Sequence, residues 1–415
     1  MDAARARLLL VITELQMGGA ARVMRDQAAA FSQFFDVDEV IFNRADGVDL
    51  PGAIEPISLD VGGGGGPIRK LLNLGRRVAR LRRIKRELGV GATISHLTGA
   101  HFVDVLSRGR EKVILYVHGS LLHNELVRGP VRFIQNHWLI PLLYNRADRV
   151  VTVSRDIRPE LVSLGVRPQK LVTINNFFDH EQIAAKSREP LSPAESAIYD
   201  AAPILVSAGR LHAQKNQAPL LDVLADVIRN RPAKLVLVGD GEERQPLADR
   251  ARSLGLSVYD AAKSAPLTPA HDVYLLGTKT NPFKYLPRSS LFLLSSGWEG
   301  FPLALCEAMI CGVPVVSTDC ATGPREILAP STGPPAQPIR EAEVGEYGVL
   351  MPLLHHAPTR DEAITVWTDT LVGLLGDPDE RLRLGGLGRK RMEDFTQERI
   401  VKQWRELIEE VLAER

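Results

Sequence analysis

The stretch that most constrains this chain is residues 295–328, SSGWEGFPLALCEAMICGVPVVSTDCATGPREIL. An apolar run at residues 291–294 leads into it, and a second run, rich in β-branched residues, lies at residues 313–316. Short apolar runs of this kind are typical of parallel strands that are covered on both faces. A proline at the first helical position loses no hydrogen bond, because its N–H would have had no partner there. The stretch therefore predicts a strand, a turn, a helix from Pro302 to about Ile310, and a second strand.

Two carboxylates frame the start of this predicted helix. Glu299 lies in the turn, and Glu307 follows eight residues later inside the helix. A carboxylate accepts hydrogen bonds in pairs, which suits the adjacent hydroxyls of a sugar or a ribose. The free N–H groups at a helix start attract an anion such as a phosphate. The combination indicates a sugar nucleotide, although a single glutamate in such a turn is more often a solvated surface residue.

Length and composition limit the possible classes of protein. A chain of 415 residues favours two domains of about 200 residues each. A formal net charge of +1 gives no sign of nucleic acid, so none is expected as a partner. Cys306, Cys311 and Cys320 are odd in number and lack zinc-site spacing, which favours a reducing cytoplasm over a disulfide framework. The apolar run before Glu14 is too short for a signal peptide, and no stretch approaches a membrane span.

The first half opens with the pattern of a Rossmann-like unit. An apolar run at residues 8–13 is followed by Gly18 and Gly19 and by a segment of helical periodicity that ends near Phe31. Glycines between a strand and a helix allow the backbone to approach a ligand closely. A plain tight turn is the alternative interpretation of this glycine pair.

A histidine follows another predicted strand of the first half. The strand at residues 113–117 ends directly before His118, and ligands of open α/β sheets bind beyond the carboxyl ends of strands. A lone histidine there is more often a structural hydrogen-bonding residue. His96, His101 and His123 have no comparable signal.

A basic helix is predicted after five consecutive glycines at residues 62–66. Residues 68–88 have apolar positions near the helical period, and residues 69–86 contain nine Arg or Lys and no acid. At about 1 kcal/mol per basic residue near an anionic leaflet, this helix could dock reversibly on a membrane. The alternative is a core-facing helix with a solvated basic face.

The second half repeats the alternation of strands and helices. Residues 181–202 are polar and contain Pro190 and Pro193, so we predict a linker between a first domain at residues 1–180 and a second at residues 203–396.

Two cations occupy the first turn of this second domain. Arg210 and Lys215 follow the strand predicted at residues 204–208. Breaking a glycosyl–phosphate bond leaves a nucleoside diphosphate, whose charge must be met by Arg, Lys and backbone N–H groups where no metal is used. A solvated pair of cations is the alternative.

These segments resemble the retaining family-4 glycosyltransferases. EGFPLALCEAMICGVPVVSTD resembles their E-x7-E signature, and GRL-x2-QKN resembles their diphosphate-binding turn. ADRVVTVS, KLVTINN and VLVGDGEERQPL are similar to other family phrases, in the family's order over nearly the whole chain. The resemblance implies an α/β chain with the GT-B fold, two Rossmann-like domains facing each other across a cleft. It also implies a C-terminal helix, residues 397–415, that crosses back to the first domain.

The resemblance also implies roles for individual residues. Glu299 would hold the hydroxyls of the donor sugar and Glu307 the ribose, while Arg210 and Lys215 would hold the diphosphate. His118 would hold the sugar near the reacting carbon. Gly18 and Gly19 would face the phosphates and the acceptor. Gly300, Phe301, Pro302 and Leu303 would offer backbone contacts to the donor.

The implied activity is transfer of a hexose or acetamido-hexose, with retention, from a nucleoside-diphosphate sugar that we expect to be UDP-linked. The acceptor would be a glycan or a polyprenyl-diphosphate-linked molecule of bacterial polysaccharide or glycoconjugate synthesis, and no metal or other cofactor is expected. The enzyme would be cytoplasmic, or peripheral at the inner face of the cell membrane through residues 69–86. The alternatives are a GT-B sugar-nucleotide epimerase or hydrolase and a non-catalytic sugar-nucleotide-binding partner subunit. A NAD-dependent dehydrogenase is disfavoured, because no G-x-G-x-x-G follows the first strand.

Overall fold

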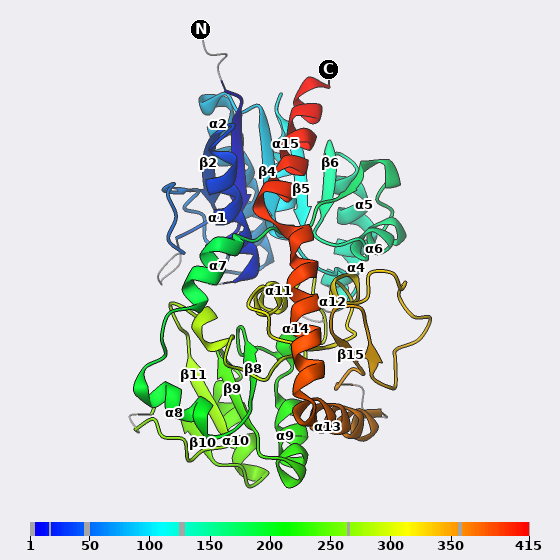
Figure 1. Ribbon diagram of the computed structural model, residues 1–415. Coiled ribbons are helices and arrows are strands. Elements are labelled where there is room, and N and C mark those ends of the chain that lie inside the picture. Colours follow the sequence, from blue (N-terminus) through cyan, green and yellow to red (C-terminus); the bar gives the residue numbers. More distant parts are fainter. Residues whose placement is uncertain are drawn as a thin grey trace. The chain divides into compact units, whose positions relative to one another are not determined.

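The computed structural model describes residues 5–15, 18–44, 50–123, 129–263, 266–355 and 359–414 (Figure 1). The chain divides into two compact units. Unit 1 consists of Met1–Phe177 and Gln397–Arg415, and unit 2 consists of Phe178–Thr396. Each unit is built on a sheet of mainly parallel strands connected by helices, which is the α/β class predicted from the sequence.

Unit 1 contains a seven-stranded parallel sheet in the order β3-β2-β1-β4-β5-β6-β7. Its strands are β1 (Arg7–Ile12), β2 (Asp36–Ile41), β3 (Ile57–Ser58), β4 (Ala92–His96), β5 (Lys112–Val117), β6 (Arg149–Thr152) and β7 (Leu171–Thr173). Its helices before the C-terminal one are α1 (Gly19–Phe31), α2 (Pro67–Leu88), α3 (Thr98–Leu106), α4 (Gly129–Ile134), a π-helical turn (Gln135–Leu139), α5 (Ile140–Tyr144), α6 (Ile157–Ser163) and a 3-10 turn (Pro168–Lys170). The strand order reverses between β1 and β4, which is where ligands bind in open α/β sheets.

The C-terminal helix α15 (Gln397–Ala413) belongs to unit 1. Trp404 is fully buried, with its ring 5.8 Å from that of Phe31 and 4.9 Å from that of Tyr116. Arg149 Nη2 lies 2.8 Å from Glu410 Oε1. One apolar stripe of α15 therefore completes the core of the first unit, and this return of the chain end was predicted from the sequence.

Unit 2 contains an eight-stranded sheet in the order β10-β11-β9-β8-β12-β13-β15-β14, in which only β14 is antiparallel to its neighbour. Its strands are β8 (Ile204–Ala208), β9 (Lys234–Val238), β10 (Val258–Asp260), β11 (Val273–Gly277), β12 (Leu291–Leu294), β13 (Val315–Thr318), β14 (Glu343–Val344) and β15 (Val349–Met351). Its helices are α7 (His180–Ser187), α8 (Pro193–Ala201), α9 (Ala218–Asn230), α10 (Arg244–Ser253), α11 (Leu303–Ile310), α12 (Pro324–Leu328), α13 (Arg360–Gly376) and α14 (Pro378–Met392). Its 3-10 turns include Ala213–Lys215, Phe283–Tyr285 and Glu393–Phe395.

The prediction of a linker at residues 181–202 was wrong. This segment forms α7 and α8 and belongs to unit 2 (Figure 1). Ser192 and Glu195 form a capping box, so Pro193 occupies the first position of a helix, where a proline is favourable. The Glu195 carboxylate also accepts hydrogen bonds from Tyr285 and Lys284. The polar, proline-containing sequence thus marks the start of a helix that is fixed to the rest of unit 2.

Candidate functional site

Four neighbouring strands of unit 2 end at the same edge of its sheet, because β9, β8, β12 and β13 are parallel and adjacent. The loops that follow β8 and β9 are in direct contact. A Cβ atom on Gly239, which has φ +145°, would lie 1.9 Å from Gly209 O, so only glycine fits there. The amide of Leu211 donates to Asp240 O at 2.9 Å. The loop that contains Arg210 and Lys215 is therefore fixed against its neighbour.

Lys215 and Glu299 form an ion pair at this edge. Lys215 Nζ lies 2.6 Å from Glu299 Oε1, and the same oxygen accepts a 2.6 Å hydrogen bond from Ser296 Oγ. Glu299 is 6% exposed, whereas the Lys215 side chain is 23% exposed. The family resemblance assigned Lys215 to the diphosphate and Glu299 to the donor sugar. The structure brings the two side chains into contact. In the described part of the chain, no hydrogen bond uses Glu299 Oε2, so this oxygen can accept bonds from a ligand.

A set of hydrogen bonds joins the two loops that hold this pair. The Gln214 side chain donates to Trp298 O at 2.9 Å, and the Gly297 amide donates to Gln214 O at 2.9 Å. Ser295 Oγ donates to Lys215 O at 2.9 Å. The backbones around Lys215 and Glu299 are therefore positioned independently of their side chains. The sequence analysis did not identify Gln214 or Ser295, because their partners lie about eighty residues away along the chain.

Arg210 lies in the same loop and is exposed. Its guanidinium makes no hydrogen bond or ion pair with another residue that the structure describes; only its carbonyl accepts a bond, from Gln217 at 3.3 Å. In the same loop, His212 Nδ1 accepts from the Gln214 amide at 3.0 Å, which stabilises the turn. Arg210 thus carries a positive charge without a counterion at the edge of the sheet where Lys215 has one.

Helix α11 begins directly after Pro302, as predicted, and Glu307 is buried on it. Among the described residues, no hydrogen bond uses the amide N–H groups of Gly300 and Phe301. The Phe301 ring contacts that of Phe395, with centroids 5.1 Å apart, and this fixes the backbone ahead of the helix. Free amides at a helix start, next to a lysine, suit an anionic or polar ligand.

The loop after β13 covers the other side of Glu299 and Gly300. The Glu299 amide donates to Ala321 O at 2.9 Å, and Thr322 Oγ1 donates to Glu299 O at 3.1 Å. Gly323 has φ +96°, and a Cβ atom there would lie 2.6 Å from Gly300 O. Burial, together with the nearby Glu299 carboxylate, raises the pKa of the Cys320 thiol, which stays protonated. This loop therefore supports Glu299 and contributes no ionised group from its cysteine.

In unit 1, His118 follows β5 and is half-buried. Its Nε2 lies 2.9 Å from Nδ1 of His96, which ends the adjacent strand β4 and is fully buried. Burial lowers the pKa of His118 to about 3 and that of His96 well below its usual value, so both rings are neutral. The sequence analysis gave no weight to His96, because nothing in the sequence shows that β4 and β5 are neighbours.

The hydrogen bonds of His96 indicate which nitrogens hold the protons. His96 Nε2 is buried and has no partner among the described residues. A buried N–H without a partner is rarer than a buried acceptor without one, so the proton of His96 belongs on Nδ1 and is donated to His118 Nε2. His118 then carries its own proton on Nδ1. This arrangement leaves His118 with an Nδ1–H for which the described residues provide no acceptor.

Gly18 and Gly19 lie at the start of α1, after β1, and both are exposed. Gly18 has extended backbone geometry and its carbonyl accepts from the Arg22 amide at 3.1 Å, as in an ordinary helix start. Because β1, β4 and β5 are adjacent and parallel, the two glycines and His118 lie at the same edge of the sheet of unit 1. Met17 of the predicted glycine turn lies outside the described residues.

Comparison with known proteins identifies the same two parts. A model described as Glycosyltransferase Family 4 matches residues 17–182, and one described as Glycosyl transferases group 1 matches residues 189–333. An uncharacterized glycosyltransferase of Methanocaldococcus jannaschii is 34% identical over 250 residues, which are 58% of this chain and 58% of that protein. This chain therefore covers less than two thirds of that relative.

Two further comparisons cover more of the chain. The N-acetylgalactosamine-N,N'-diacetylbacillosaminyl-diphospho-undecaprenol 4-alpha-N-acetylgalactosaminyltransferase of Campylobacter jejuni is 26% identical over 330 residues, 78% of this chain and 83% of that protein. The structure of Anabaena HepE in complex with UDP is similar in fold, with a TM-score of 0.71, 18% identity and coverage of 97% of this chain and 100% of HepE. Residues 17–182 therefore belong to the Glycosyltransferase Family 4 domains and residues 189–333 to the Glycosyl transferases group 1 domains, on a GT-B fold.

Proposed function

We propose that the protein is a retaining, metal-independent hexosyltransferase of bacterial polysaccharide or glycoconjugate synthesis. It transfers a hexose or acetamido-hexose from a UDP-linked donor to a hydroxyl of a glycan or polyprenyl-diphosphate-linked acceptor. The observation that supports this most strongly is the contact between Lys215 and Glu299 at the carboxyl edge of the unit 2 sheet. The UDP bound to HepE and the lipid-linked acceptor in the name of the Campylobacter relative support the same assignment.

The donor replaces the internal partner of Lys215. In the absence of ligand, the Lys215 ammonium and the Glu299 carboxylate neutralise each other. A diphosphate gives the lysine a second anion to bind, and Arg210, which has no counterion, adds a second cation. Glu299 then accepts hydrogen bonds from the sugar hydroxyls, and Glu307 accepts those of the ribose. Two cations in place of a metal ion are the basis for expecting metal independence.

The chemistry needs no nucleophile from the protein. The acceptor hydroxyl oxygen forms a bond to the anomeric carbon while the bond from that carbon to the β-phosphate oxygen breaks. The hydroxyl proton passes to the departing phosphate oxygen, so charge balances within the two substrates. Lys215, Arg210 and the amides of Gly300 and Phe301 stabilise the negative charge that develops on the leaving group. His118 donates from Nδ1 to the sugar, and Gly18 and Gly19 line the acceptor side.

A binding screen followed by a transfer assay tests this function. We expect UDP and one UDP-sugar to raise the melting temperature, and GDP-sugars and ADP-sugars to have little effect. With the matching acceptor, transfer should proceed in excess EDTA, and the anomeric coupling constant of the product should match that of the donor. Release of free sugar or of an isomerised sugar nucleotide without acceptor would instead identify a hydrolase or an epimerase. An inverted anomeric centre would contradict retention.

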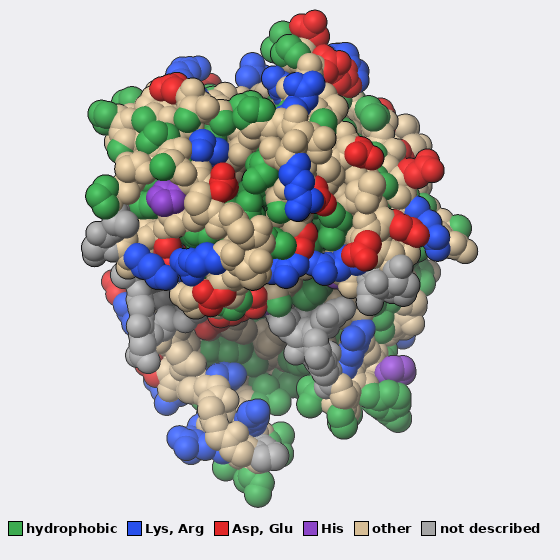
Figure 2. Space-filling model, turned by 90° about the horizontal axis from the view of Figure 1, so that it is seen from below, with side chains coloured by type: hydrophobic (Ala, Val, Ile, Leu, Met, Phe, Trp, Pro, Cys, Tyr) green, Lys and Arg blue, Asp and Glu red, His purple; other side chains and the backbone are tan. Residues whose placement is uncertain are grey.

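We also propose that unit 1 docks on an anionic membrane surface. Three large apolar side chains at the start of α2 are exposed, Ile68 (78%), Leu71 (70%) and Leu72 (58%). Arg69 and Lys70 lie between the first of them and the other two. A second exposed apolar group lies on α4, the π-helical turn and α5, and consists of Val131, Phe133, Ile134, Trp138 and Leu142. On the face shown in Figure 2, green hydrophobic side chains lie next to blue Lys and Arg side chains. Exposed apolar groups beside cations are typical of interfacial binding.

The nine basic residues of α2 do not all take part in such docking. Lys85 is buried, with Nζ 2.6 Å from Asp104 Oδ1 and 2.8 Å from Glu111 Oε1. Leu81 is fully buried in the core of unit 1. One face of α2 therefore packs against the core, as the alternative interpretation of the sequence expected, and the other face is free to contact lipid.

Co-sedimentation with vesicles that contain phosphatidylglycerol tests the docking. Within the described residues, no helix is both long enough and apolar enough to cross a membrane. Changing Arg69, Arg76, Arg83 and Arg86 to Gln should reduce binding by several fold, and the effect should shrink at high salt. Unaltered binding of this variant would show that α2 is not the docking element.

A further inference from the structure

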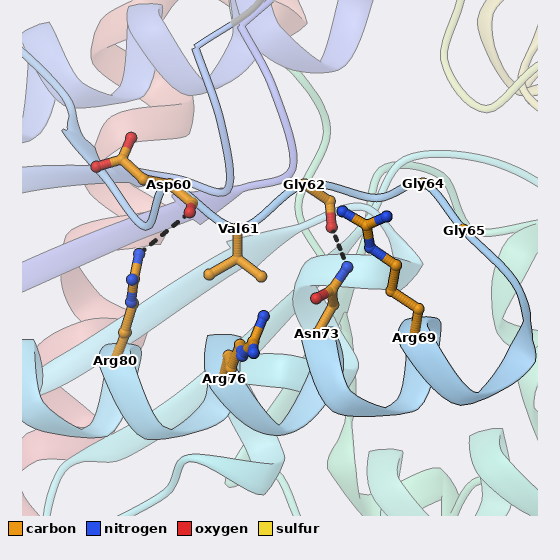
Figure 3. A pocket seen from close by; sticks show the side chains of 9 residues that line it. All are labelled: Asp60, Val61, Gly62, Gly64, Gly65, Arg69, Asn73, Arg76 and Arg80. Carbon is orange, nitrogen blue, oxygen red and sulfur yellow. Dashed lines mark hydrogen bonds between the residues drawn. The ribbon is translucent and has the colours of Figure 1, made fainter.

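A cavity in unit 1 lies between the glycine-containing loop at residues 60–65 and one face of α2. Its volume is about 370 Å³. Arg69, Asn73, Arg76 and Arg80 line it from the helix, at spacings of four, three and four residues, which places them on one face. In Figure 3 these four side chains rise from α2 toward the loop that passes over them. The cavity is therefore lined by three arginines on one side and largely by backbone on the other.

Side chains of α2 hold the loop in place. Asn73, which is 6% exposed, donates to Gly62 O at 2.7 Å, and Arg77 donates to Val61 O at 2.8 and 3.1 Å. Arg80 donates to Asp60 O at 3.2 Å (Figure 3). The carbonyl oxygens of Asp60, Val61 and Gly62 are thus already bonded to side chains of α2. Among the described residues, no hydrogen bond uses the amide N–H groups of Gly62, Gly64 and Gly65.

The charges around the cavity are unbalanced. The side chains of Arg69 and Arg76 are exposed and have no hydrogen bond or ion pair with any residue that the structure describes. Asp60 is the acidic residue of the lining, and its carboxylate accepts from Ser58 Oγ at 2.6 Å. In Figure 3 this carboxylate points away from α2. The cavity therefore combines uncompensated guanidinium groups with free backbone amides, both of which bind phosphate oxygens.

We propose that this cavity binds the phosphate or diphosphate group of a lipid-linked molecule. Arginine matches phosphate oxygens with paired N–H donors, and the loop amides supply further donors. The exposed side chains of Ile68, Leu71 and Leu72 at the same end of α2 suit the apolar chain of such a molecule. This inference rests on the proposed function, in which the molecule is the lipid-linked acceptor, and it assigns the acceptor's diphosphate to unit 1 while the donor's diphosphate binds in unit 2.

Isothermal titration of the full chain with farnesyl diphosphate, below its micelle concentration, tests the assignment. The test variant carries Arg69→Gln and Arg76→Gln, which remove no hydrogen bond or ion pair between described residues. The control carries Arg83→Gln and Arg86→Gln, the same change in charge on the same helix outside the cavity lining. We expect the test variant to bind farnesyl diphosphate on the order of ten- to a hundredfold more weakly than the wild type, and the control to bind within about twofold.

Further arms of the experiment separate the possible sources of the phosphate. UDP should bind the wild type and both variants equally, because its proposed site is in unit 2. Failure of UDP to bind the wild type would overturn the proposed function. The titration with farnesyl diphosphate would then still decide whether the cavity binds a diphosphate. Equal loss of farnesyl diphosphate binding in both variants would show a diffuse charge effect and overturn the cavity assignment. Binding of the wild type to phosphatidylglycerol vesicles but not to farnesyl diphosphate would assign the cavity to a membrane headgroup and overturn the acceptor assignment.

Discussion

Replacing Glu299 by Gln should strengthen the binding of UDP while it slows sugar transfer. Glu299 holds the Lys215 ammonium at 2.6 Å in the absence of ligand, so UDP must compete with an internal carboxylate for this lysine. Glutamine keeps the shape of the side chain and removes its charge. UDP binding and sugar transfer change in opposite directions, because UDP lacks the sugar whose hydroxyls Glu299 holds in the donor.

The size of the binding effect follows from the contact. A hydrogen bond to a charged group contributes about 1.5–3 kcal/mol, and one between neutral partners about 0.5–1.5 kcal/mol. Lys215 is 23% exposed, and water therefore screens part of the difference. We expect UDP to bind about five- to tenfold more tightly to Glu299→Gln, which corresponds to roughly 1–1.4 kcal/mol. Transfer should slow by about a hundredfold, because the variant lacks the charged acceptor for the sugar hydroxyls.

Titration calorimetry with UDP and initial-rate measurements with the UDP-sugar measure the two effects. Glu362→Gln is a matched control, because Glu362 is an exposed residue of α13 and the substitution changes net charge equally. This control should leave both quantities unchanged. If Glu299→Gln bound UDP as weakly as wild type or more weakly, the exchange of partners by Lys215 would be refuted.

Three further predictions concern other parts of the chain. Arg210→Ala should lower turnover by about 10²–10³-fold at an unchanged melting temperature, since the side chain is exposed; a near-normal rate would exclude it from the site. Trp404→Ala should lower the free energy of unfolding by about 3–5 kcal/mol in denaturant titrations, and a loss under 1 kcal/mol would show that α15 is not part of the core. Burial alone would raise the pKa of Glu195, but hydrogen bonds from Tyr285 and Ser192 lower it from 4.5 to about 2. Its stabilisation is therefore complete above about pH 4.5 and is lost as the pH falls toward 2, and the acid unfolding curve of Glu195→Gln should lack this component.

The sequence predicted where individual helices and strands lie along the chain better than it predicted which elements lie side by side in space. The helix after Pro302 was predicted nearly to the residue, because its proline, its glycines and the flanking apolar runs are all local signals. The second strand runs over Val315–Thr318 rather than residues 313–316, since Pro314 cannot donate to a sheet. Local signals also produced the error at residues 181–202, where the same prolines that favour a linker also favour the start of a helix.

The contacts within the candidate site required the sheet order, which the sequence does not contain. Lys215 and Glu299 are 84 residues apart and meet only because β8 and β12 are neighbours. The family resemblance assigned a role to each residue separately, and it gave no reason to expect an ion pair between them. The sequence did not predict the cavity beside α2, because a run of glycines by itself indicates only a loop.

His96, which lies on a neighbouring strand, determines which ring nitrogen of His118 carries the proton. With Nε2 buried and unpartnered, His96 donates from Nδ1 to His118 Nε2 and leaves the proton of His118 on Nδ1. Histidine-selective ¹⁵N labelling with long-range ¹H–¹⁵N correlation spectra should show the Nδ1–H tautomer for His118 in the wild type. In His96→Phe no donor fixes this tautomer, so the signal should change and kcat should fall more than KM rises. His96→Gln, whose amide can donate, should restore part of both. A wild-type spectrum with the proton of His118 on Nε2 would reverse the direction of this hydrogen bond, and His118 would then face the sugar as an acceptor.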